Sequence, residues 1–340
     1  MRITRSFRAM AVASAVCALA AAGSAHAALT TFQTYVGNYG VSTDGWGSTT
    51  QQGTIQAFVP VGATVVGAYL YTSTFFNGTL SGIGGSLAGQ AVNYATNLGT
   101  IPSPACCELT AARADVTSIV KPLVDGGPGG VYNFGITETS SSQDGSALVV
   151  VYELASLGVS TVAILDGYSR VDGESTTFNF AQPLDPTAPG FSAEMRLGIG
   201  FSFNNTGCTG SGQTSVVTVN GTTITERAGC NDDSADGAAG NGNLITVGGD
   251  NDPFSPFLPT TAQDHERYNL VPQIGVGDTS INIRTINASR DDNIFLAVFR
   301  VTGEATVCDP NCPVPEPLTP ALVGVALLGL GLQRRYGRRA

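Results

Sequence analysis

The sequence predicts an all-β protein: a β-sandwich, jelly-roll-like, with one short helix. Apolar and β-branched runs recur along the chain and are bounded by Gly, Asn, Asp and Pro, which is typical of short strands. The chain of 340 residues holds 43 glycines and only 12% charged residues, a composition that disfavours helices. No regular alternation of strands with helices appears, and many short strands at this spacing favour a sandwich.

The first half of the chain has six strand-like runs. We expect strands at Thr54–Val59, Thr64–Phe76, Val131–Thr137, Ala147–Leu154, Thr161–Leu165 and Thr176–Phe180. The one persuasive helical stretch is Leu109–Leu123, which Pro122 should end early because proline lacks the backbone N–H.

The second half has six further runs. They are Ala193–Phe203, Ser215–Val219, Thr222–Thr225, Leu244–Val247, Ser280–Ile286 and Ile294–Val301. Asn220-Gly221 separates VVTV from TTIT, and such a pair predicts a two-residue hairpin turn with φ above zero at both positions.

The body between the two ends is long enough for one large or two modest β domains. We place it at residues 28–312. A subdivision near Pro183–Gly190 would be a linker or a long loop within one sandwich. We favour the loop, because the late run DDNIFLAVFRV could pair back with early strands.

The N-terminus has the features of a cleaved secretory signal peptide at residues 1–27. Arg2, Arg5 and Arg8 precede an apolar run, and Ala25-His26-Ala27 is a small-x-small cleavage pattern. We therefore expect export through the Sec translocon and removal of the segment by signal peptidase.

The charge is unevenly distributed. Residues 28–316 contain 26 acidic and 9 basic residues, a net charge of −17, while the remaining basic residues lie in the two ends. Such an acidic body argues against nucleic acid and anionic lipid as partners, and it fits a solvated extracellular protein.

The C-terminal segment, residues 313–340, is too short to be a good membrane span. Leu318–Leu332 would cover roughly 22 Å of a ~30 Å hydrocarbon core as a helix. Four arginines follow, Arg334, Arg335, Arg338 and Arg339, which would hold that end on the cytoplasmic side.

The order of features in this segment is more specific than a generic anchor. The segment resembles the PEP-CTERM sorting signal of Gram-negative bacteria that make exopolysaccharide. The features that carry the resemblance are Val314-Pro315-Glu316-Pro317, the short apolar helix 318–332 and the arginine cluster. The resemblance implies recognition by an exosortase, transient residence in the inner membrane, cleavage near Pro-Glu-Pro, and delivery to the cell surface or extracellular matrix. It specifies a destination and no activity.

A second resemblance concerns the body. Four short motifs occur in an order that resembles the DUF3344-like β-rich domains of secreted bacterial surface proteins. They are Ala114–Val120, Gly130-Val131-Tyr132, Gly145–Glu153 and Ile164–Gly167. This resemblance implies a sandwich and carries over no catalytic residues.

The sharpest local site candidate is the acidic loop DDSADGAAGNGN. Calcium prefers six to eight oxygen ligands, and Asp232, Ser234, Asp236 and Asn243 follow part of the spacing of a calcium loop. The bidentate Glu at the twelfth position is missing, so an acidic surface loop is the alternative. Asp250, Asn251 and Asp252 follow closely and could add oxygens.

Evidence for an enzyme is weak. His265 is the only histidine outside the signal peptide, which is too few nitrogens for a typical metal or triad site, and we read Asp264–Arg267 as a salt-bridged surface turn. Nothing in the spacing of the acids selects a glycosidase pair. We therefore expect no catalytic residues and a non-enzymatic protein.

The six cysteines of the exported chain favour disulfides. Cys208 and Cys230 flank the predicted hairpin, and Cys308 and Cys312 could close a small ring. Cys106-Cys107 would form a strained vicinal disulfide or pair with other cysteines.

Aromatic side chains are the other candidates for ligand contact. Trp46 lies in the glycine-rich stretch TDGWGS, which predicts a loop, where it could stack on a sugar ring. Tyr35, Tyr39 and Tyr168 are further candidates, and packing in the core is the alternative for each.

Together these features predict an exported surface or matrix protein, structural or adhesive, in an exopolysaccharide or biofilm context. The alternative is a calcium-assisted carbohydrate-binding module that uses Asp232, Asp236 and Trp46.

Overall fold

Antiparallel strands form most of the chain that we describe. The computed structural model describes residues 28–47, 50–75, 79–102, 108–200, 215–229, 245–260, 263–288 and 293–309. These residues form four β-sheets, each named below by one of its central strands. Within the described residues there is a single α-helix, so the predicted all-β class with one short helix is confirmed.

The first part of the chain builds two of the sheets. The β10 sheet has the order β2 (Tyr39–Trp46), β10 (Gln143–Glu153), β4 (Thr64–Phe75), β8 (Glu108–Asp115), β7 (Thr96–Pro102). The β9 sheet has the order β3 (Gln52–Val59), β9 (Gly130–Glu138), β5 (Gly85–Leu87), β6 (Gln90–Val92). Helix α2 (Thr117–Val124) packs beside β4.

The second part of the chain builds the other two sheets. The β19 sheet has the order β1 (Thr30–Gly37), β11 (Ser160–Asp166), β19 (Asn293–Thr302), β13 (Ala193–Gly200), β16 (Ile245–Val247), with β17 (Arg267–Asn269) also paired to β13. The β18 sheet has the order β15 (Thr222–Ala228), β14 (Ser215–Val219), β18 (Ser280–Ile286), β12 (Glu174–Phe180), β20 (Ala305–Cys308). A 3-10 turn, Val271–Gln273, follows β17.

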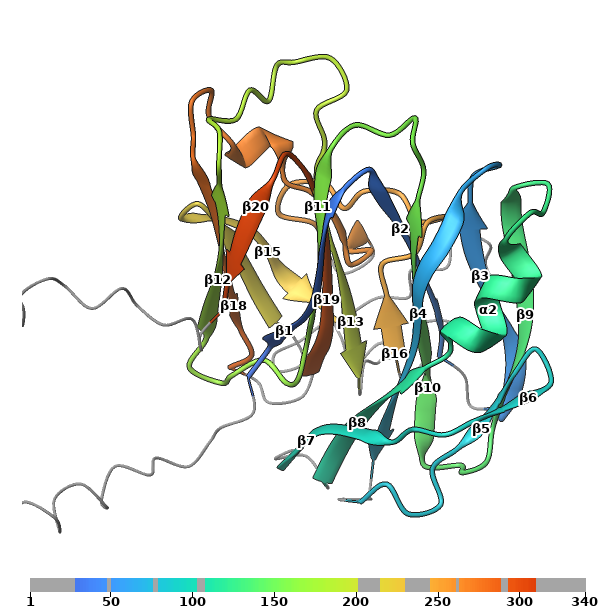
Figure 1. Ribbon diagram of the computed structural model, residues 1–340. Coiled ribbons are helices and arrows are strands. Elements are labelled where there is room, and N and C mark those ends of the chain that lie inside the picture. The colour runs from blue at the N-terminus through green and yellow to red at the C-terminus, as the bar shows by residue number, and fades with distance from the viewer. Residues whose placement is uncertain are drawn as a thin grey trace, which may run out of the picture. The chain divides into compact units, whose positions relative to one another are not determined.

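The four sheets stack as layers, with an apolar cluster between each neighbouring pair (Figure 1). Phe178 of the β18 sheet meets Phe299 of the β19 sheet at 5.0 Å between ring centroids. Tyr71 of the β10 sheet meets Phe295 of the β19 sheet at 6.3 Å. Leu148 of the β10 sheet and Phe134 of the β9 sheet share the third cluster.

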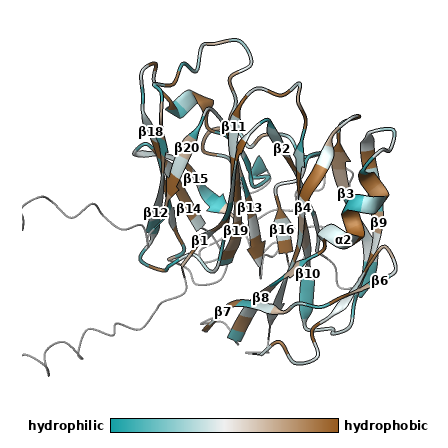
Figure 2. Cartoon of the chain, viewed as in Figure 1, coloured by the Kyte–Doolittle hydropathy of each residue, from teal (hydrophilic) through white to brown (hydrophobic). Residues whose placement is uncertain are grey.

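This layering explains two kinds of strand in the sequence. The inner strands β10 and β11 are buried on both faces, which explains near-continuous apolar runs such as ALVVVY. The outer strands β9 and β18 alternate buried and exposed residues, because one of their faces meets water. Figure 2 shows the contrast, with hydrophobic colouring on β13 and β19 and hydrophilic colouring on β12 and β15.

The chain passes from the first pair of sheets to the second between Glu153 and Ser160. Only β1 departs from this order, because it pairs with β11 although it precedes β2. The segment 183–190 connects β12 to β13 within the second pair, and Leu184 packs into the cluster between the β18 and β19 sheets.

The predicted helix Leu109–Leu123 was wrong in its first half, because residues 108–115 form strand β8. Ala111 packs toward the β19 sheet and Ala112 toward the β9 sheet, so burial on both faces overrides the helix propensity of alanine. The helix starts only at Thr117, contains Pro122 and ends at Val124.

The predicted hairpin is confirmed. Strands β14 and β15 pair around Asn220 and Gly221, whose φ angles are +47° and +82°. Asn220 is one of few non-glycine residues with positive φ, and its side-chain oxygen accepts a hydrogen bond from the N–H of Asn282 at 2.9 Å.

Among the described residues, no helix is long and apolar enough to cross a membrane. The predicted signal peptide 1–27 and the whole predicted sorting segment, including Val314–Pro317, helix 318–332 and the four tail arginines, lie outside the described residues.

Candidate functional site

A cleft of about 520 Å³ opens where three of the sheets meet. Its walls come from β2 and β10 of the β10 sheet, from β3 and β9 of the β9 sheet, and from β13, β17 and β19 of the β19 sheet. The turn after β16 closes one end with Asp250 and Asn251. We name it the three-sheet cleft.

Strand register gathers charged groups on one wall of the three-sheet cleft. Glu194 and Arg196 are two residues apart on β13, so their side chains project from the same face. Across the ladder, Glu194 lies opposite Arg300 of β19, and Arg196 lies opposite Arg267 of β17. Pairing therefore brings three arginines and one glutamate together from three strands.

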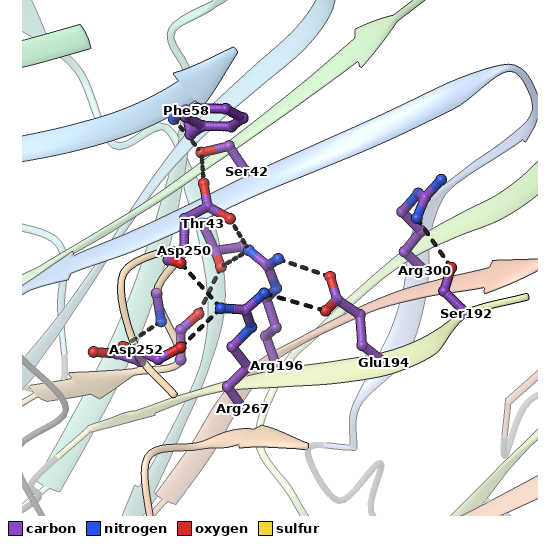
Figure 3. Close-up of polar contacts among 12 residues, drawn as sticks. Ser42, Thr43, Phe58, Ser192, Glu194, Arg196, Asp250, Asp252, Arg267 and Arg300 are labelled. Carbon is purple, nitrogen blue, oxygen red and sulfur yellow. Dashed lines mark hydrogen bonds and ion pairs between the residues drawn. The ribbon is translucent and has the colours of Figure 1, made fainter. Parts of the chain in front are cut away.

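Arg196 is the centre of this wall (Figure 3). Its side chain is only 4% exposed, its Nη2 lies 2.7 Å from Glu194 Oε1, and its Nη1 pairs with Asp250 Oδ1. Nη1 also donates to Thr43 Oγ1 at 2.9 Å. Burial alone would lower the pKa of Arg196, but Asp250 and Glu194 outweigh it and raise that pKa, so the guanidinium stays charged.

Arg267 joins this wall to the turn after β16. Its Nη1 donates to the carbonyl oxygens of Asp250 at 2.9 Å and Asp252 at 2.8 Å, and its Nη2 lies 3.5 Å from Glu194 Oε2. The turn is tight at Gly249, where an added Cβ would lie 2.8 Å from Asn251 Oδ1 and 2.9 Å from Asp252 Oδ2. A side chain at this position would therefore crowd the side chains of Asn251 and Asp252.

Glu194 remains ionised between these arginines. Burial would raise its pKa, but the charge of Arg196, then of Arg267 and then of Arg300 holds the pKa below its ordinary value. A buried carboxylate that is paired twice in this way is a structural partner rather than a proton donor or acceptor.

Asp44 on β2 behaves differently. Its Oδ2 accepts the N–H of Gln56 at 2.5 Å, which links β2 to β3. Burial raises the pKa of Asp44 to about 7, the N–H groups of Gln56 and Gly45 lower it in part, and the charges of Asp252 and Asp250 raise it. The three-sheet cleft therefore gains negative charge as pH rises through 7.

Arg300 lies at the other end of the polar wall, beside Ser192 (Figure 3). Its Nη1 donates to Ser192 Oγ at 3.1 Å and its Nε to the Tyr39 carbonyl oxygen at 3.3 Å. Within the described residues, Arg300 has no carboxylate within ion-pair distance, unlike Arg196 and Arg267.

The rim of the three-sheet cleft on the β9 sheet is apolar and open to solvent. Phe58 of β3 and Val131 of β9 face each other in the strand register and are 46% and 56% exposed. The backbone of Phe58 is held by its N–H, which donates to Ser42 Oγ at 2.9 Å. An exposed aromatic beside fixed polar groups is a feature of ligand-binding surfaces.

Two of the carboxylates that line the cleft are engaged in ion pairs. Glu194 and Asp250 both pair with Arg196. Within the described residues, no group of three or more His, Cys, Asp or Glu side chains could hold a metal ion.

The predicted calcium ligands Asp232, Ser234, Asp236 and Asn243 lie outside the described residues. The neighbouring acidic group at 250–252 is described, and both of its carboxylates have partners. Asp250 pairs with Arg196 and accepts from Ser42, and Asp252 Oδ2 accepts the N–H of Gly249 at 2.6 Å.

The interpretation of Asp264–Arg267 as a surface turn was wrong. Asp264 and Glu266 are fully buried. Asp264 Oδ1 accepts from the Tyr268 hydroxyl at 2.6 Å, and Glu266 Oε1 accepts the N–H of Gly229 at 2.7 Å. Buried carboxylates need such donors, so the segment is a polar core that fixes β17.

The expectation that Trp46 lies in a loop was also wrong. Trp46 is the last residue of β2, it is 6% exposed, and its indole covers Gly53 so closely that an added Cβ there would lie 2.1 Å from Nε1. Its ring is part of the core between the β9 and β10 sheets, the packing role that was the alternative.

Of the tyrosine candidates, Tyr168 is fully buried, while Tyr35 and Tyr39 contact each other at 5.6 Å between ring centroids. Cys308 forms a disulfide, but Cys106, Cys107, Cys208, Cys230 and Cys312 lie outside the described residues, so the proposed pairings stay predictions.

Sequence inspection missed the residues that line the three-sheet cleft. A signal was present, because AEMRLGIG places two charges inside an otherwise apolar strand, and buried charges are almost always paired. Their partners are distant in sequence, since Asp250 lies 54 residues from Arg196 and Thr43 lies 153 residues from it, and no pattern in the sequence identifies them. No protein-family model matches the chain, and no curated protein matches it either.

Proposed function

We propose that this chain is an exported, non-enzymatic surface or matrix protein that acts adhesively by binding carbohydrate in the three-sheet cleft. The observation that carries the proposal is the open apolar rim of Phe58 and Val131 beside a rigid polar wall. A pyranose ring has one face of C–H groups and an edge of hydroxyls, so it fits an aromatic surface with polar groups alongside.

The proposed location rests on the two ends of the sequence. A signal peptide at residues 1–27 and the PEP-CTERM-like segment 313–340 support export, processing by an exosortase and delivery to an exopolysaccharide-containing matrix. The acidic body, with its net charge of −17, supports a solvated extracellular role.

The non-enzymatic character is supported by the pairing of the acids in the cleft. Glu194 and Asp250 neutralise Arg196, and Glu194, whose pKa the arginines lower, is a poor general acid. The polar wall is better suited to hold three sheets in one geometry and to present hydrogen-bonding groups to a ligand.

The test is a calorimetric titration of the full chain with the exopolysaccharide of the producing organism, with calcium and again with chelator. We expect binding in both conditions, and a loss of at least tenfold in affinity for Phe58→Ala, because a stacked aromatic contributes about 1.5 kcal/mol. Val276→Ala, which removes an apolar side chain that is 70% exposed and does not line the cleft, is the control.

Three outcomes decide the proposal. Absence of binding in both conditions would overturn it. Equal binding by Phe58→Ala and the wild type would remove the three-sheet cleft as the site. Binding that disappears with chelator would favour the alternative, a calcium-assisted carbohydrate-binding module that depends on Asp232 and Asp236.

A further inference from the structure

Resting on the carbohydrate-binding role above, we propose that the three-sheet cleft recognises an acidic saccharide unit, whose carboxylate pairs with Arg300. The proposal names the chemical class of the ligand and one residue that selects it. It depends on how the charges of the cleft are already paired.

The first argument is the unequal pairing of the three arginines. Arg196 has two carboxylate partners and Arg267 has Glu194 and two carbonyl oxygens. Arg300 contacts only neutral oxygens, those of Ser192 and Tyr39. Unlike the other two arginines of the cleft, Arg300 has no described carboxylate within ion-pair distance.

The second argument is that the nearest carboxylate is already committed. Glu194 lies opposite Arg300 in the strand register, yet its oxygens are 2.7 Å from Arg196 and 3.5 Å from Arg267. Because Arg196 is buried at 4% exposure, losing Glu194 would leave a buried charge poorly compensated, which is costly. Glu194 therefore stays with Arg196, and Arg300 keeps capacity for an external anion.

The third argument is that Arg300 is held in place. Two of its N–H groups bind Ser192 Oγ and the Tyr39 carbonyl, and Ser192 is itself fixed by its N–H, which donates to Thr302 Oγ1 at 2.9 Å. Guanidinium has five N–H donors, so the remaining donors can form charge-assisted bonds to a carboxylate. A preorganised arginine loses little entropy on binding.

The apolar rim supplies the other half of the site. Phe58 and Arg300 both line the three-sheet cleft, one from the β9 sheet and one from the β19 sheet. A pyranose that bears a carboxylate combines a C–H face for the aromatic with an anion for the guanidinium. A neutral sugar uses only the first of these contacts.

The acidic body affects how the affinity for an acidic saccharide depends on salt. A net charge of −17 repels a polyanion at long range, but that repulsion is screened beyond ~8 Å at physiological ionic strength, whereas contact with Arg300 is not. We therefore expect affinity to hold or rise when salt is raised moderately, the opposite of binding to a basic surface patch.

The experiment compares two probes on the full chain by calorimetry with chelator present. The probes are exopolysaccharide fragments from the producing organism and the same fragments after chemical reduction of their carboxyl groups to alcohols. We expect the native fragments to bind at least tenfold more tightly, because hydrogen bonds to charged groups are the stronger class. Arg300→Gln should bind both probes with the lower affinity.

Matched variants separate charge from folding. Arg300→Lys keeps the positive charge and should retain part of the preference, while Arg284→Gln removes an arginine of β18 that does not line the cleft and should retain all of it. Equal thermal unfolding temperatures for Arg300→Gln and the wild type would exclude a folding defect. Ser192→Ala removes the hydroxyl that holds Arg300, and this second, milder variant should reduce the preference for native fragments.

Failure of this inference differs from failure of the proposed function. Equal binding of native and reduced fragments, or a preference that survives in Arg300→Gln, would overturn the acidic-saccharide inference and leave carbohydrate binding intact. No binding of either probe would overturn both.

Discussion

Glu138 shows how one buried carboxylate makes this fold sensitive to pH. It ends β9, is 7% exposed, and its Oε1 accepts a hydrogen bond from Ser146 Oγ at 3.2 Å, while Oε2 has no hydrogen-bond partner among the described residues. Burial raises the pKa of Glu138 to about 8, although the donors of Ser146 and Gly145 lower it in part. The folded protein therefore holds this group protonated at neutral pH.

The consequence is a loss of stability at alkaline pH. The folded pKa of about 8 lies above the ordinary value of 4.5. The contribution of protonated Glu138 to the free energy of unfolding is therefore complete below pH 4.5 and is lost as pH rises through 8. Asp44 and Glu174, each with a pKa raised by burial to about 7, act in the same direction.

We predict that Glu138→Gln flattens this dependence. The wild-type midpoint of thermal unfolding should fall by several degrees between pH 6 and pH 9, and the variant should fall less, because its amide cannot ionise. Differential scanning calorimetry at both pH values measures this. Glu304→Gln, at an exposed position, is the control, and an unchanged slope in Glu138→Gln would contradict the assignment.

At the scale of single elements, the β14–β15 hairpin was predictable because its turn chemistry is local. Gly221 has a φ of +82° and open space around its Cα, so a side chain there would meet no atoms within 4 Å. The cost of replacing it is therefore almost purely that of the backbone conformation.

We predict that Gly221→Ala lowers the free energy of unfolding by about 1 kcal/mol, because L-residues disfavour positive φ. Gly135→Ala is the matched control. Gly135 also has open space, but it lies in strand β9 without positive φ, so alanine should be neutral or stabilising there. Urea unfolding of both variants gives the comparison, and an equal effect at the two sites would rule out the turn as the cause.

Strand β8 was not predictable in this way. Its sequence LTAARAD reads as a helix by propensity, and it becomes a strand because β4 and β7 pair with it on either side. Strand β2 was missed for a similar reason, since its residues GVSTDGW are polar and glycine-rich yet lie buried between layers. At such positions, burial between two layers outweighs the intrinsic secondary-structure propensity of the residues.

At the scale of the whole molecule, the four layers share their cores. The cluster between the β10 and β19 sheets joins the first pair of sheets to the second, and Val149 and Val298 belong to it from opposite sides. The described residues all belong to one compact unit. We therefore expect the two pairs of sheets to unfold together.

The prediction uses Trp46, the only tryptophan of the chain, which lies between the β9 and β10 sheets. Phe299→Ala, in the cluster between the β18 and β19 sheets, should destabilise by about 3–5 kcal/mol. Its effect should appear equally in Trp46 fluorescence and in far-UV circular dichroism during urea unfolding. A fluorescence midpoint that stays at the wild-type value would show that the two pairs unfold independently.

The sequence by itself determined the fold class, most strands and the hairpin turn, because alternation and turn residues form patterns over a few neighbouring residues. The targeting segments at the two ends are predictions from patterns of the same local kind. Only the tertiary structure decided which sheets are inner layers, that Trp46 and Glu266 are buried, that Arg196 and Arg267 pair with Glu194, and that Arg300 lies opposite Glu194 in the strand register. Those contacts join residues up to about a hundred positions apart. Register and sheet packing bring them together, and neither is encoded in any short stretch of the chain.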